Sequence, residues 1–144
     1  MSDTDVQEYL ARLLAVQQRA LAELTDMPRE ELRFAADVQR WTSVRRLLLR
    51  LGDHLREHTT QLVEAREAIG AAPTMPQRIL AQAMVAQGYV LGAMVGLQDE
   101  DLDTAPAPGE WTPRQVLEHI ISTQAGYLEA IQRARQTGRL VERD

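Results

Sequence analysis

Apolar residues recur along the chain at helical spacing, in stretches separated by proline, glycine and acidic residues. Between residues 43 and 69 they alternate steps of four and three positions, at Val44, Leu48, Leu51, Leu55, His58, Leu62, Ala65 and Ile69. This spacing is typical of one face of a helix that packs against other helices. Because the chain is also rich in Ala, Leu, Gln, Glu and Arg, the pattern predicts an all-α fold.

Four long stretches of this kind predict four helices. The first runs from Thr4 to Leu24 with Asp3 as its N-cap, the second from Ser43 to Ile69, the third from after AAPTMPQ to Leu97, and the fourth from Pro113 to Gly138. We therefore expect a single domain over residues 1–144, an antiparallel four-helix bundle of the up-down-up-down type.

The fourth helix has the clearest start signal, the sequence WTPRQV. Thr112 is placed as N-cap, Pro113 stands at the first helical position, and Gln115 completes a capping box. RWTSVRRLLLRL and EWTPRQVLEHII both place Trp-Thr before an apolar helix. This internal similarity predicts two related helical hairpins.

Composition narrows the functional classes. The formal charge of −5, with Arg mixed among Asp and Glu, gives no basic face, so we expect no nucleic-acid partner. The absence of Cys excludes disulfides, thiolate ligands and a Cys nucleophile. The first residues, MSDTDVQEYLARLL, are acidic and amphipathic, unlike a signal peptide, and no apolar run has the length of a membrane span. We expect a cytoplasmic protein with no membrane partner.

All three histidines fall on the predicted second and fourth helices. His54 and His58 are four residues apart, so both imidazoles lie on one helical face, as a divalent metal ion requires from a single helix. His119 borders the apolar face of the fourth helix and could join them if both helices face one interior. Three nitrogen ligands would leave a coordination position open, as in catalytic metal sites. The alternative is that the histidines are ordinary helix residues of an interaction module.

The pentad HLREH also fits the His-x-x-Glu-His motif of zinc peptidases, in which Glu57 would be the base. The chain is too short for such a peptidase, and Glu57 shares a polar stripe with Arg50.

Two segments resemble the DinB/YfiT-like family of four-helix-bundle metalloproteins. SVRRLLLRLGDHLREHTTQL is similar to the family's His-x-x-x-His-x-x-Gln helix, and GEWTPRQVLEHI to its Trp-[Ser/Thr]-Pro-Arg-x-x-Leu-x-His helix. The resemblance implies that His54, His58 and His119 bind the metal and that Gln61 supports a ligand. The order of the two motifs is exchanged relative to many relatives, and Arg50 stands where relatives often have another His.

By the same resemblance, the cofactor is a divalent transition metal, zinc or nickel first and iron or manganese as alternatives. Some relatives are transferases that use low-molecular-weight thiols, which implies a small-molecule substrate and a thiol S-transferase activity. Relatives are often dimers, so a homodimer is implied as well. The alternative is a metal-binding or stress-associated helical bundle without catalysis.

Overall fold

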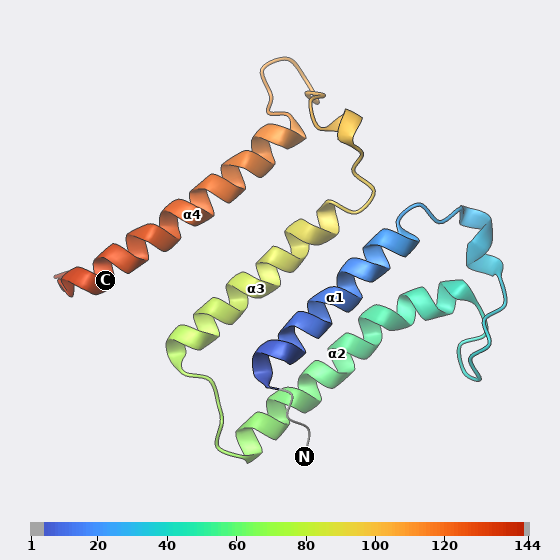
Figure 1. Cartoon of the computed structure of the whole chain (residues 1–144), viewed down its shortest axis with the longest axis horizontal. Coiled ribbons are helices and arrows are strands. Elements are labelled where there is room, and N and C mark those ends of the chain that lie inside the picture. The colour runs from blue at the N-terminus through green and yellow to red at the C-terminus, as the bar shows by residue number, and fades with distance from the viewer. Residues whose placement is uncertain (1–4, 143–144) are drawn as a thin grey trace. The chain divides into compact units, whose positions relative to one another are not determined.

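The structure, a computed structural model, describes residues 5–142, and within this range it is all-α (Figure 1). It contains the helices α1 (Val6–Leu24), α2 (Val44–Ala68), α3 (Met75–Ala93) and α4 (Pro113–Thr137), with short 3-10 helices η1 (Arg29–Arg33) and η2 (Asp99–Asp101). No strand forms among these residues, apart from an isolated bridge between Ala35 and Ser43. The prediction of an all-α fold with four long helices is confirmed.

Helix boundaries follow the capping residues. Thr112 accepts a hydrogen bond from the Gln115 backbone N–H at 3.2 Å, and Gln115 Oε1 accepts one from the Thr112 N–H at 2.9 Å, so the predicted capping box of α4 is confirmed. Gly138 ends α4 with a φ of 62°, in the left-handed region. At the other end of the chain, α1 begins at Val6 with Asp5 as N-cap, and the predicted cap Asp3 lies outside the described residues.

The boundaries predicted for the third helix were wrong. It begins at Met75, before the predicted start, because the Gln77 side chain accepts a hydrogen bond from the Thr74 N–H at 2.9 Å and caps the first turn. Pro76 is tolerated there, since the N–H groups of the first turn have no partner within the helix. The helix ends at Ala93, before the predicted Leu97, and Gly96 in the following turn has a φ of 83°.

The helix lengths repeat through the chain. Both α1 and α3 contain 19 residues, and both α2 and α4 contain 25. Each helix of the second pair begins and ends 69 positions after its counterpart, from 6 to 75 and from 44 to 113 at their starts. A 3-10 helix lies between the long helices of each pair. This constant offset supports the prediction of two related helical hairpins.

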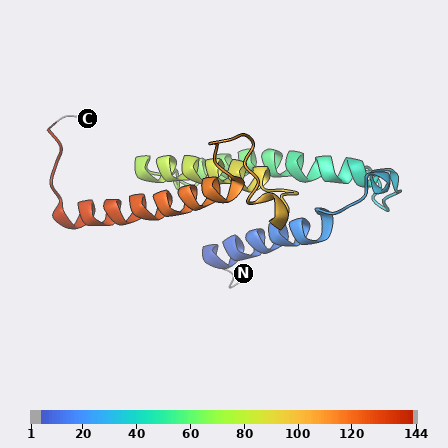
Figure 2. The ribbon, with the colours of Figure 1, turned by 90° about the horizontal axis from the view of Figure 1, so that it is seen from above.

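The chain divides into two units, Met1–Gly96 and Leu97–Asp144, which we describe separately. In the first unit, η1 follows α1 and precedes α2 in the chain, and α1 and α2 run antiparallel (Figure 1, Figure 2). The Val44 N–H donates to the carbonyl of Phe34 at 3.1 Å and ties the loop after η1 to the start of α2. In the second unit, the Arg114 N–H donates in the same way to Leu102 at 2.9 Å. The bundle arrangement and the single domain stay predictions.

None of residues 5–142 has a buried side chain. The predicted packing face of α2 is therefore accessible, and Leu55 and Leu62 are each 63% exposed. Among the described residues, no helix combines the length and the apolar character needed to cross a membrane.

Candidate metal centre

His54 and His58 lie next to each other on α2. Their ring centres are 4.4 Å apart and the ring planes meet at 63°, an edge-to-face contact. Metal–nitrogen bonds of about 2.0–2.1 Å place two nitrogens of one ion about 3 Å apart. The two rings are close enough to reach this spacing by rotation of their side chains, so the pair fits a divalent ion.

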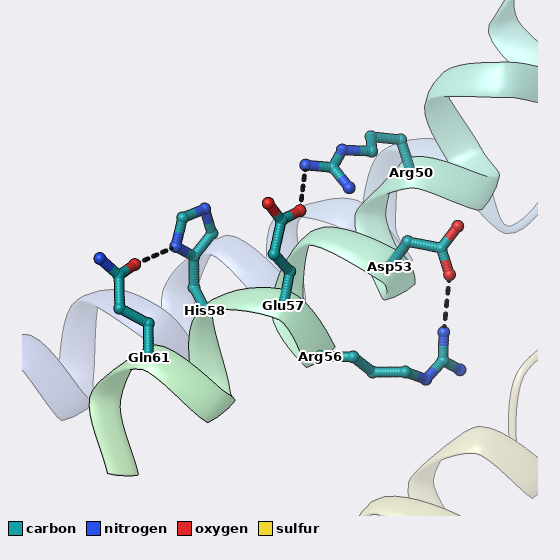
Figure 3. Close-up of polar contacts among 6 residues, drawn as sticks. All are labelled: Arg50, Asp53, Arg56, Glu57, His58 and Gln61. Atoms are coloured by element: carbon teal, nitrogen blue, oxygen red, sulfur yellow. Dashed lines mark hydrogen bonds and ion pairs between the residues drawn. The ribbon is translucent and has the colours of Figure 1, made fainter. Parts of the chain in front are cut away.

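Gln61 orients one of these rings. Its Oε1 atom lies 2.7 Å from Nδ1 of His58, one helical turn earlier (Figure 3). Because a carbonyl oxygen only accepts, Nδ1–H is the donor, and the lone pair of the neutral ring is then on Nε2. A hydrogen bond that fixes the tautomer of a ligand histidine is a regular feature of metal sites. The role of Gln61 beside a metal ligand stays a prediction.

Arg50 and Glu57, seven residues apart on α2, form an ion pair next to His58 (Figure 3). Nη2 of Arg50 lies 2.6 Å from Oε2 of Glu57, and the Arg50 guanidinium stands 5.3 Å from the centre of the Trp41 ring. The hydrogen bond and charge of Arg50 lower the pKa of the Glu57 carboxyl, and His58 and His54 act in the same direction. A carboxylate held ionised by an arginine is a weak base, which argues against the peptidase role of Glu57.

A groove of about 970 Å³ lies between α1 and α2. Leucine and valine side chains from both helices form most of its lining, and Arg50 and His54 are among its polar residues. The sequence pattern includes His58, and not His54, in the packing face of α2. The structure instead places His54 among the groove residues, since it follows Leu47 and Leu51 on the face of α2 that borders the groove.

His119 occupies a different setting, on α4 in the second unit. Its ring contacts Trp111 edge-to-face, with centres 5.0 Å apart and planes at 63°. Its Nδ1 atom lies 3.5 Å from the Thr123 hydroxyl, at the outer limit of a hydrogen bond. Trp111, the residue before the N-cap Thr112, thus packs against the His119 ring.

A bidentate ion pair between Arg114 and Asp103 links α4 to the loop before it. Nε and Nη2 of Arg114 lie 2.7 Å and 3.0 Å from the two carboxylate oxygens of Asp103. The hydrogen bond from Arg114 lowers the pKa of Asp103, whose carboxylate in turn raises the pKa of Arg114. Asp103 of the same chain is therefore the carboxylate partner of Arg114.

The structure brings together His54, His58 and Gln61 and describes His119 within the other unit. Across residues 5–142 it gathers no cluster of three or more His, Asp or Glu side chains around one point. The three-histidine site stays a prediction. The aromatic contacts of Arg50 and His119 were not predicted from the sequence. The available signal is their equal spacing, because Arg50 lies seven positions after the N-cap Ser43 and His119 lies seven positions after the N-cap Thr112.

These features define an all-α protein with a histidine pair supported by a glutamine on one helix and an aromatic-supported histidine on another. Residues 84–143 match the DinB superfamily, which confirms over this stretch the family inferred from the sequence. The matched residues include His119 and the WTPRQVLEHI motif but not His54 or His58. In comparisons with curated proteins and with solved structures, nothing matches the chain significantly.

Proposed function

We propose that this protein binds a divalent transition metal ion through His54, His58 and His119 and transfers a low-molecular-weight thiol to a small electrophile. The observation that carries the proposal is the arrangement on α2: two imidazoles one turn apart, with Gln61 accepting from Nδ1 of His58 at 2.7 Å. Residues 84–143, which include His119, match the DinB superfamily, and members of this superfamily often bind metal. This match supports including His119 in the proposed site. Imidazole ligands suit zinc and nickel, and also iron or manganese at such sites.

In this proposal, side chains of the protein orient the histidine rings that bind the metal ion. Gln61 holds the His58 ring with Nε2 available, and Trp111 supports the His119 ring on α4. When bound, a divalent ion with an open position would lower the pKa of an incoming thiol. The thiol proton passes to solvent, the sulfur forms a bond to an electrophilic carbon, and the leaving group departs with its bonding electrons.

Further parts of the proposal follow from this chemistry. The thiol is exogenous, since the chain has no Cys. We propose the cytoplasm as its compartment, because thiols remain reduced there. We also propose a homodimer, with neither nucleic acid nor a membrane as partner.

The test is thiol-dependent consumption of a chloronitrobenzene electrophile by zinc- or nickel-loaded protein, for a panel of low-molecular-weight thiols. We expect at least one thiol to be consumed, and His58→Ala to lose most of the rate, because it removes a ligand of the proposed metal ion. Arg56→Gln is the matched control, since Arg56 pairs with Asp53 on another side of α2 (Figure 3).

Two results would change the proposal. Full activity of His58→Ala would contradict a role for the metal pair in the reaction. A tightly held metal without any thiol-dependent reaction would favour the non-catalytic alternative, in which the ion only stiffens the helices.

A further inference from the structure

Arg50 takes the place in the first hairpin that His119 takes in the second. Arg50 stands seven positions after the N-cap Ser43, and His119 stands seven positions after the N-cap Thr112. Each side chain contacts the tryptophan ahead of its helix, Trp41 or Trp111. The first hairpin therefore has a permanently charged arginine at the position where the second hairpin has a proposed metal ligand.

The partner of this cation, Glu57, is the one carboxylate residue between the two histidines in the sequence. Glu57 follows His54 by three positions, the spacing at which side chains on a helix are neighbours, and it directly precedes His58. Carboxylate oxygens are common ligands of divalent ions. The 2.6 Å contact with Arg50 directs the Glu57 carboxylate toward the N-terminal end of α2 (Figure 3).

The Arg50 side chain is less exposed than that of Arg56, the arginine of the neighbouring ion pair on α2. Its side chain is 26% exposed, whereas Arg56, which pairs with Asp53, is 80% exposed. Trp41 covers one face of the guanidinium, and the groove between α1 and α2 borders it as well. Stacking on an aromatic ring while donating to a carboxylate is a role that suits arginine better than lysine.

We propose that Arg50 is a positioning residue that keeps the Glu57 carboxylate off the metal ion held by His54 and His58. This inference rests on the proposed metal site. Its consequence is that the fourth coordination position stays open to a thiol and is not filled from within the chain. Replacing Arg50 by a neutral residue releases Glu57 to become a ligand.

The experiment uses the full chain loaded with Co²⁺, whose visible absorption reports ligand number and type. Parent, Arg50→Gln, Glu57→Gln and the double variant are titrated with Co²⁺, with Arg50→Lys to test rescue by a cation. Arg56→Gln is the matched control because it removes an Arg–carboxylate pair from the same helix and frees Asp53, which lies one and five positions from the histidines and so does not share their helix face. Far-UV circular dichroism checks that each variant keeps its helices.

We expect Arg50→Gln to bind Co²⁺ about tenfold more tightly and with a changed visible spectrum, the lower end of the effects that outer groups have on metal sites. Glu57→Gln, Arg56→Gln and the double variant should resemble the parent, and Arg50→Lys should lie close to it. An unchanged Kd and spectrum for Arg50→Gln, or a double variant that keeps the change, overturns the role of Arg50 while the metal site stands. If Arg50→Gln loses its helices, the Co²⁺ spectrum of Glu57→Gln is compared with that of the parent. A difference between the two spectra means that Glu57 is already a ligand in the parent, which overturns the role of Arg50. A parent that binds no Co²⁺ overturns both this inference and the proposed function.

Discussion

Replacing Gln61 by Leu should weaken metal binding without weakening the fold. The substitution removes the Oε1 atom that accepts from Nδ1 of His58 at 2.7 Å, so the ring loses its fixed tautomer and orientation. Loss of such a supporting hydrogen bond typically costs about 10–100-fold in metal affinity. Because the contact is exposed to solvent, we expect the lower end, about tenfold, which corresponds to about 1.4 kcal/mol of binding free energy.

The stability of α2 should change little, since Leu and Gln have similar helix propensities. The assay is competitive titration of Zn²⁺ against a chromophoric chelator for the parent, Gln61→Leu and Gln61→Glu. Glu keeps an acceptor oxygen at this position and should retain most of the affinity. Thr60→Leu is the matched control, because the Thr60 hydroxyl donates to the Arg56 carbonyl and contacts neither histidine.

Equal Zn²⁺ affinity of Gln61→Leu and parent would refute the reasoning, because His58 would then need no support from Gln61. An equal loss in Thr60→Leu would refute it as well, since the effect would come from the helix as a whole.

Three further predictions concern α4 and the loop before it. Thr112→Ala removes the acceptor for the Gln115 N–H and should cost about 1 kcal/mol in urea unfolding, with Thr112→Ser near the parent. Gly138→Ala places a Cβ at a φ of 62° and should cost about 1 kcal/mol in the same assay. Asp103→Asn breaks the ion pair with Arg114. Because the pKa of Asp103 is lowered in the folded chain, the ion pair stabilises the folded chain above about pH 3.9, the unfolded value of that pKa. This stabilisation is lost as pH falls through the folded pKa. The melting temperature of Asp103→Asn should therefore be lower than that of the parent at pH 7 and equal to it in strong acid; a gap that persists in acid, or a cap variant as stable as the parent, would contradict these assignments.

Helix positions were predictable where a local signal is complete. Thr112, Pro113 and Gln115 specify the start of α4 within four residues, so the sequence alone located it. The predicted start of α3 is too late because the helix begins before Pro76, and the first helical turn accepts a proline.

The same distinction applies to the candidate site. His54, His58 and Gln61 are three to four residues apart on one helix, so helical geometry alone brings them together. The pair of Arg50 with Glu57 spans seven residues and depends on side-chain rotamers and on Trp41 in the preceding loop. Whether His119 joins the pair depends on packing between helices, which no local pattern specifies.

The most direct test of the central claim is the metal content of the chain, measured by mass spectrometry on protein purified without a histidine tag. The parent should hold about one transition metal ion per chain, and His119→Ala should hold little, because the proposed site needs His119 as a ligand in addition to His54 and His58. Absence of metal from the parent, even after loading with zinc or nickel, would contradict the account. Full occupancy in His119→Ala would contradict the part assigned to α4.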